Sequence, residues 1–230
     1  MIRRLVIALS VATTGVLLTS TAGLAATFTL FGDATFVGGH NSPTGVQLRS
    51  SATIAPGFGA IGFSLPAGTT FADISTLATD FMVTEGDCGG GAPRFSIEFA
   101  NGKNGFVYIG PAPNFTQCPS GWNSTGNLLS APHTIDTSQL GGTFYDSLAH
   151  AYAAYGSLMV KSIALVVDAS FAVVGGTQTV VVDNVNINGT IFTFESKDSC
   201  KDGGWQTFTS SPGPFKNQGD CVSFFATGGR

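Results

Sequence analysis

Residues 179–195 read Thr-Val-Val-Val-Asp-Asn-Val-Asn-Ile-Asn-Gly-Thr-Ile-Phe-Thr-Phe-Glu, the clearest indication of fold class in the chain. Two runs rich in β-branched and aromatic residues flank Asn188-Gly189, a pair that tolerates the positive φ angles of a type I′ turn. The stretch therefore predicts a β-hairpin whose strands are Thr179–Ile187 and Thr190–Glu195.

A carboxylate interrupts the apolar pattern of the first hairpin strand. Counted with the period of two that strands follow, Val181, Val185 and Ile187 share one face, and Asp183 falls on that same face. An unpaired charge among apolar side chains is costly, so Asp183 must be hydrogen-bonded, paired or metal-bound. Two interpretations stay open: Asp183 is a calcium ligand, or it is a buried acceptor for backbone N–H groups.

The rest of the chain has the same signature of short apolar runs between Gly, Pro and Asn, which is typical of all-β proteins. Between Tyr145 and Gly156, aromatic residues and leucine recur at spacings of three and four, which predicts one short helix. The further expected strands are Thr27–Phe31, Val46–Ile54, Ala60–Leu65, Leu77–Thr84, Arg94–Phe99, Gly105–Ile109 and Met159–Asp168.

The first 26 residues have the features of a secretory signal peptide. Arg3 and Arg4 precede an apolar run, and small residues around Ala25 and Ala26 offer a cleavage site. The run is too short and too broken by Ser and Thr to cross a bilayer core of about 30 Å. We therefore expect a secreted protein, extracellular or at the cell surface, without a membrane span after cleavage.

The charge balance argues against nucleic acid as a partner. Arg3 and Arg4 are two of ten basic residues, so eight basic side chains then face fourteen acidic ones, a net charge of −6. Nucleic-acid binding needs clustered Lys and Arg that replace counterions along the phosphate backbone.

Four cysteines in an exported chain indicate two disulfides. Of three pairings, nearest neighbours are preferred, Cys88 with Cys118 and Cys200 with Cys221, because each pair lies within one coherent segment. The chain has no Cys-x-x-Cys motif, and its histidines lie far from both pairs, which disfavours a zinc site. The second pair closes residues 197–230 into a C-terminal cassette that follows a sandwich over residues 27–196.

The loops around the first cysteine pair hold the candidate binding residues. Trp122 stands in the polar context Ser-Gly-Trp-Asn-Ser, where its ring could stack on the apolar face of a sugar. Arg94, Asn123 and Asp87 could supply hydrogen bonds at the edge of that ring. Other aromatic residues of this segment either join this face or fill the core, namely Phe106, Tyr108 and Phe115.

The run Val160-Lys-Ser-Ile-Ala-Leu-Val-Val-Asp168, followed by Val180-Val-Val-Asp-Asn-Val185, resembles the final strands of galactose-binding-like jelly-rolls. Carbohydrate-binding modules of secreted bacterial glycoside hydrolases commonly have this form. The resemblance implies a jelly-roll β-sandwich, glycan as a ligand, and a structural calcium ion held partly by Asp183. The C-terminal segment, Cys200-Lys-Asp-Gly-Gly-Trp205 with Phe215-Lys-Asn-Gln-Gly-Asp-Cys-Val-Ser223, is similar to a tail of exported bacterial proteins of unknown function.

These observations predict a secreted, non-catalytic binding protein whose ligand is a glycan. The first alternative is a structural or protein-interaction module of the cell envelope, with residues 197–230 as the docking unit. The second alternative is a polysaccharide-cleaving enzyme, which needs two carboxyl groups about 5–10 Å apart. The sequence pairs no such carboxyls and has neither a His-Glu-x-x-His nor a Gly-x-Ser-x-Gly motif, so we expect no enzyme.

Overall fold

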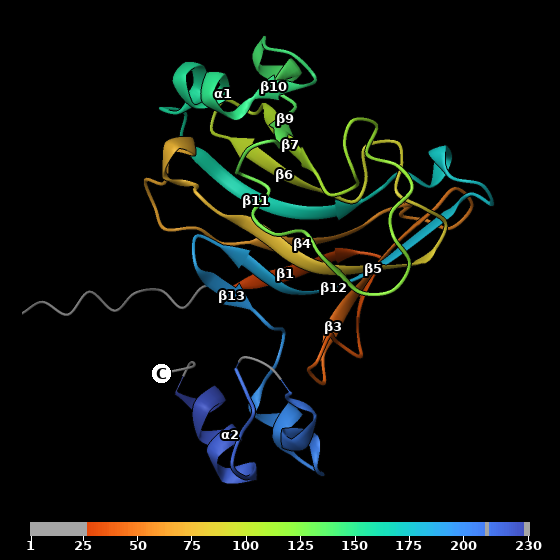
Figure 1. Ribbon diagram of the computed structural model, residues 1–230, viewed down its shortest axis with the longest axis vertical. Coiled ribbons are helices and arrows are strands. Elements are labelled where there is room, and N and C mark those ends of the chain that lie inside the picture. Colours follow the sequence, from red (N-terminus) through yellow and green to blue (C-terminus); the bar gives the residue numbers. More distant parts are fainter. Residues whose placement is uncertain (1–26, 210–211, 228–230) are drawn as a thin grey trace, which may run out of the picture.

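The computed structural model describes residues 27–209 and 212–227, and the predicted signal peptide, residues 1–26, lies outside them. Two antiparallel sheets pack face to face (Figure 1). The five-stranded sheet contains β1 (Phe28–Gly32), β4 (Gly59–Phe63), β11 (Val160–Val167), β6 (Arg94–Phe99) and β7 (Asn104–Tyr108), in that order. The six-stranded sheet contains β2 (Ala34–Val37), β3 (Gly45–Ser51), β12 (Thr177–Ile187), β5 (Leu77–Glu85) and β8 (Asn123–Ser124), and β13 (Thr190–Phe192) also pairs with β12.

Successive strands cross from one sheet to the other. After β3 in the six-stranded sheet the chain enters β4 in the five-stranded sheet and returns to β5. It crosses again to β6 and β7, returns to β8, crosses to β11, and comes back to β12 and β13 in the six-stranded sheet. This crossing pattern is that of a jelly roll. The predicted fold class, an all-β jelly-roll sandwich, is confirmed.

The core lies between the two sheets. On the five-stranded side Phe95, Ile163 and Leu165 are fully buried, and Leu48 and Val180 face them from the six-stranded side. Each such side chain contributes about 1.5–3 kcal/mol of transfer free energy when it leaves water. The alternating burial along β6 and β11 follows directly from the period of two in their sequences.

The face predicted for Val181 and Asp183 is wrong, because a bulge interrupts β12. Asn184 has φ 50°, and the pairing with β5 shifts its register between Asp183 and Asn186. The core cluster includes Val180 and Val182 before the bulge and Val185 and Ile187 after it, but not Val181. Asp183 therefore lies on the outer face of the six-stranded sheet rather than among the core residues.

The predicted helix is present but shorter. Helix α1 (Leu148–Tyr155) begins after Ser147, whose Oγ accepts a hydrogen bond from the backbone N–H of His150, so Tyr145 lies outside it. Beside it, β9 (Thr134–Ile135) pairs with β10 (Asp146–Ser147). Three short 3₁₀ turns complete the sandwich region, η1 (Phe71–Asp73), η2 (Ser138–Leu140) and η3 (Ser170–Ala172).

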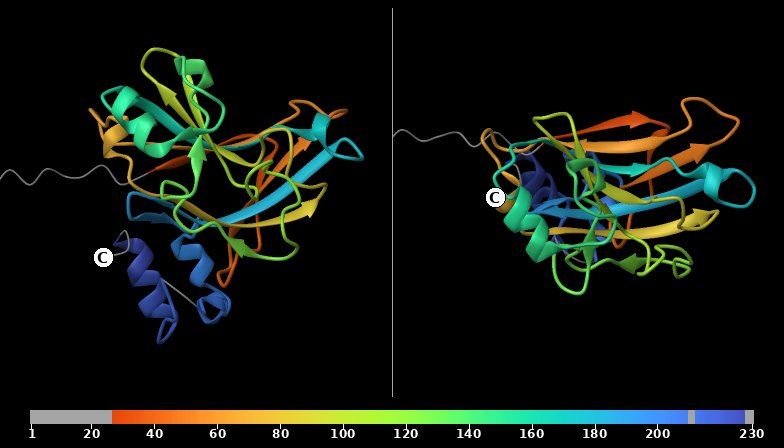
Figure 2. Two further views of the ribbon diagram at one scale, coloured as in Figure 1. Left: turned by 45° about the horizontal axis from the view of Figure 1, so that its top comes forward. Right: turned by 90° about the horizontal axis from the view of Figure 1, so that it is seen from above.

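The C-terminal cassette contains a second helix that was not predicted, α2 (Gln218–Ala226), preceded by η4 (Lys197–Cys200) and η5 (Gly204–Thr207). Its own small apolar cluster surrounds Phe208 and the Cys200–Cys221 disulfide. The cassette lies at the opposite end of the molecule from α1 (Figures 1 and 2). Both predicted disulfides are confirmed, the other joining Cys88 to Cys118. No helix within the described residues is long and apolar enough to cross a membrane.

Candidate functional site

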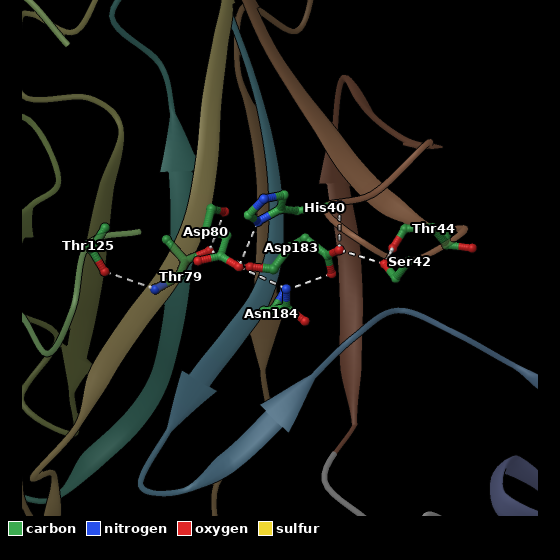
Figure 3. Close-up of polar contacts among 8 residues, drawn as sticks. All are labelled: His40, Ser42, Thr44, Thr79, Asp80, Thr125, Asp183 and Asn184. Carbon is green, nitrogen blue, oxygen red and sulfur yellow. Dashed lines mark hydrogen bonds and ion pairs between the residues drawn. The ribbon is translucent and has the colours of Figure 1, made fainter. Parts of the chain in front are cut away.

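The site is built where β5 and β12 lie side by side on the outer face of the six-stranded sheet. Asp80 of β5 and Asp183 of β12 are direct cross-strand partners. Residues opposite each other in an antiparallel pair project from the same face, so the two carboxylates are neighbours there. The loop 38–44, which joins β2 to β3, folds against this point (Figure 3). We call His40, Asp80, Trp122, Asp183 and Asn184 the outer-face site.

Asp183 fastens the loop 38–44 to the sheet. Its Oδ2 accepts hydrogen bonds from the backbone N–H of His40 at 2.8 Å and from Ser42 Oγ at 2.7 Å. Its Oδ1 accepts the backbone N–H of Asn184 at 2.7 Å. A Cβ on Gly39 would lie 2.5 Å from Asp183 Oδ2, so the loop reaches this carboxylate only because residue 39 is glycine.

The carboxyl of Asp183 is fully buried, and this burial raises its pKa to about 6. The hydrogen bonds from Ser42, Asn184 and His40 oppose that rise, while the nearby carboxylate of Glu195 adds to it. Glu195 anchors the other end of the loop, because its Oε1 accepts the backbone N–H of Thr44 at 2.7 Å. Burial also raises the pKa of Glu195.

His40 and Asp80 form the solvent-facing part of the site. His40 Nδ1 lies 3.0 Å from Asp80 Oδ2, which also accepts a hydrogen bond from Asn184 Nδ2 at 2.9 Å. The side chains of His40 and Asp80 are 30% and 18% exposed, so both reach solvent. The imidazole stacks on the indole of Trp122, with ring centroids 4.8 Å apart and planes inclined by 11°. Trp122 directly precedes β8, the strand that pairs with β5 at the edge of the sheet.

Asn123 and Asp87 hold the loops that present Trp122. Asn123 Nδ2 donates to the carbonyl oxygens of Pro119 and Gly121, which closes the turn before the tryptophan. Asp87 accepts the backbone N–H groups of Cys88 and Cys118 at 2.7 and 2.9 Å, and so ties the two ends of the first disulfide loop together. A shallow pocket of about 350 Å³ adjoins this loop, lined by Val83, Gly86, Asp87, Gln117, Cys118, Pro119 and Ser120.

Arg94 lies elsewhere, on the outer face of the five-stranded sheet. Its guanidinium forms two hydrogen bonds with Asp168, at 2.6 and 2.7 Å, and lies 5.1 Å from the ring centroid of Phe106. Because Trp122 lies beside β8 of the six-stranded sheet, the structure does not bring the four predicted binding residues into one site. It brings Trp122 together with His40 and Asp80 instead.

His40, Asp80 and Asn184 were missed from the sequence as binding residues. These residues come together through the pairing of β5 with β12 and the path of the loop 38–44. Neither feature can be predicted from the residues next to each of them in the sequence. One signal was present: the glycine pair before His40, Gly38-Gly39, is typical of a backbone that closely approaches another part of the chain.

Asp183 has the environment expected of a buried acceptor, since its two oxygens accept hydrogen bonds from two backbone N–H groups and from the hydroxyl of Ser42. Within residues 27–209 and 212–227, no group of three or more His, Cys, Asp or Glu side chains could hold a metal ion. The calcium hypothesis for Asp183 stays a prediction.

No protein-family model matches the chain, and no curated protein matches it significantly. Among solved structures it is similar to a family 11 carbohydrate-binding module of a cellulosomal cellulase of Clostridium thermocellum. The TM-score is 0.40 at 14% identity, over 76% of this chain and 94% of the module. It is also similar to an exo-β-agarase, with a TM-score of 0.36 at 12% identity, over 74% of this chain and 24% of the agarase.

Proposed function

We propose that this protein binds glycans without cleaving them, and that the outer-face site makes the contact. The observation that carries the proposal is the stacked pair of Trp122 and His40, held beside the carboxylate of Asp80. Apolar faces of sugar rings stack on aromatic rings, while sugar hydroxyls need polar partners at the ring edge. One site thus combines an aromatic surface with hydrogen-bonding groups.

The residues of the site have different roles in this proposal. Trp122 provides the stacking surface, and His40 with Asp80 provides polar atoms that reach solvent. Asp183 is fully buried, so it positions the loop 38–44 and does not touch the ligand. A site whose geometry is already held in the free protein loses less conformational entropy on binding.

The burial of Asp183 favours binding over hydrolysis. A glycosidase needs two carboxyl groups that both reach the scissile bond. Of the cross-strand pair Asp80 and Asp183, only the partly buried Asp80 reaches solvent, and the oxygens of Asp183 are engaged by the protein itself. The two disulfides and the predicted signal peptide support an extracellular location for this binding.

Retention on insoluble polysaccharides tests the proposal. We expect the wild-type protein to be retained by at least one of cellulose, chitin, xylan and agarose, and Trp122→Ala to lower this affinity about tenfold through loss of one stacking ring. Phe171→Ala is the matched control, because Phe171 is an aromatic residue that is 78% exposed on η3. Equal retention of Trp122→Ala and the wild type would remove the outer-face site from the function.

A further inference from the structure

Four aromatic rings form a two-layered cluster beside β7, the edge strand of the five-stranded sheet. The inner layer consists of Tyr108 and Phe115, each 6% exposed. The outer layer consists of Phe144 and Tyr145, which are 45% and 51% exposed. We call these four residues the aromatic platform. Phe144 and Tyr145 precede β10, so they come from a segment far along the chain from the inner pair.

The stacking geometry orients the outer rings. Phe144 stacks on Tyr108 with centroids 5.4 Å apart and planes inclined by 22°, and Tyr145 stacks on Phe115 at 5.9 Å and 26°. Since one face of each outer ring is covered by an inner ring, its exposed area belongs to the opposite face and the edges. The two outer rings meet at 78°, with centroids 4.7 Å apart, and thus form a corner open to solvent.

Hydrogen bonds fix both the inner ring Tyr108 and the residue next to the outer rings, Asp146. The phenol of Tyr108 donates to Asp136 Oδ2 at 2.8 Å, and burial raises the pKa of Tyr108, which keeps the donor protonated. Asp146, the residue after Tyr145, accepts a hydrogen bond from Thr137 Oγ1 at 2.7 Å and lies 2.8 Å from His150 Nδ1. These side-chain hydrogen bonds fix one inner ring and the residue that follows the outer rings, so the platform is pre-organised.

The size of the exposed surface indicates what can bind there. An aromatic side chain offers 150–250 Å², so two half-exposed rings present on the order of 200 Å². A stable protein interface needs roughly 800 Å² from each partner. A small-molecule site encloses most of its ligand, whereas these rings form an open surface. A polymer of sugar rings fits best, because it can lay one or two apolar ring faces on the platform and continue beyond it.

We propose that the aromatic platform is a second glycan-contact surface, independent of the outer-face site. This inference extends the proposed function, since it names another surface for the same class of ligand. The two surfaces belong to different sheets, with Trp122 next to β8 and the platform next to β7. One protein molecule would then engage a glycan at two places, or bridge two chains of it.

The test is a titration of the full chain, labelled with ¹⁵N, with soluble hexasaccharides of cellulose, chitin, xylan and agarose. We expect shifts of the backbone amides of residues 143–146, together with Tyr108 and Phe115, with at least one of these oligosaccharides. The double variant Phe144→Ala/Tyr145→Ala should lose these shifts and about tenfold in retention on the corresponding polysaccharide. Both side chains are half exposed, so the variant should melt close to the wild type.

The outcomes separate the two hypotheses. Shifts confined to the loop 38–44, Asp80 and Trp122 would overturn the second surface and leave the outer-face site standing. Shifts confined to the platform would support the second surface and contradict the outer-face site. If none of the four oligosaccharides shifts either set of amides, both hypotheses are wrong. Phe171→Ala serves as the control, because its exposed ring belongs to neither surface.

Discussion

The substitution Asp183→Asn should change how the stability of this protein depends on pH. The pKa of Asp183 is raised from its ordinary value of 3.8 to about 6, with burial as the largest cause. Because the folded-state pKa lies above the unfolded one, folding takes up a proton between these values. The associated stability is fully present below about pH 4 and is lost as the pH rises through 6. Asparagine does not titrate, so the variant lacks this loss.

The magnitude follows from the two pKa values. At about 1.4 kcal/mol for each tenfold change in an equilibrium constant, the difference between 3.8 and about 6 amounts to about 3 kcal/mol. The variant has a cost of its own. One amide oxygen can still accept the N–H of His40 and the hydroxyl of Ser42, but the amide nitrogen then faces the N–H of Asn184. This conflict between two donors costs about 1–3 kcal/mol at every pH.

Urea unfolding of both proteins at pH 4, 5, 6, 7 and 8, followed by tryptophan fluorescence, measures the effect. We expect Asp183→Asn to be less stable at pH 4, and the difference to move by about 3 kcal/mol in favour of the variant by pH 8. Other groups also make stability depend on pH: the pKa values of Asp73, Glu98 and Asp146 are lowered, and that of Glu195 is raised. They are present in both proteins, so the difference in unfolding free energy between the variant and the wild type reduces their influence. Parallel curves of unfolding free energy against pH for the two proteins would show that the pKa of Asp183 is not raised in the folded state.

Three further changes probe the fold. Phe95→Ala removes a fully buried ring and should cost about 3–5 kcal/mol in urea unfolding, whereas Phe171→Ala should stay within about 0.5 kcal/mol. Asn188→Ala places alanine at φ 52° and removes the acceptor for the backbone N–H of Ser75, so we expect the free energy of unfolding to fall by about 2–3 kcal/mol. An unchanged urea midpoint would contradict this role of Asn188. Replacing Cys200 and Cys221 by Ser removes a disulfide with a sequence separation of 21, whose loop closure contributes about 3 kcal/mol of stability. We expect faster amide hydrogen exchange in α2 but not in β12. Equal exchange rates in α2 of the variant and the wild type would contradict this stabilising role.

Much of the fold could be predicted because its signals are local. The strands with strong apolar alternation, such as β6 and β11, appear where their patterns place them. The turn at Asn188 has positive φ at both central residues, as its dipeptide predicts. Strand β2 was missed because its Thr35 and Phe36 are both exposed at the sheet edge, so no alternation marks it. Helix α2 was missed because its periodicity is hidden by two adjacent phenylalanines and a cysteine.

The candidate site was less predictable than the fold. The polar neighbours of Trp122 mark it in the sequence, but its partner His40 lies 82 positions earlier, in a Gly-Gly-His-Asn-Ser-Pro segment that is typical of a turn. Nearness in sequence predicts that Arg94 lies close to Trp122, yet the chain crosses from one sheet to the other between them. The predicted face of Asp183 failed because one residue at positive φ, Asn184, reverses the alternation that follows it.

The all-β class, most strand positions and the hairpin at Asn188-Gly189 follow from the amino-acid sequence, and the preference for nearest-neighbour cysteine pairs agrees with both disulfides. These properties depend on side-chain periodicity, turn chemistry and short loop closure, which act over a few residues or within one segment. By contrast, the contact of Asp183 with the loop of His40, and the stacking of Phe144 and Tyr145 on Tyr108 and Phe115, could be seen only in the folded molecule. Such contacts depend on strand register and sheet crossing, because packing of the whole core selects them and no local pattern encodes them.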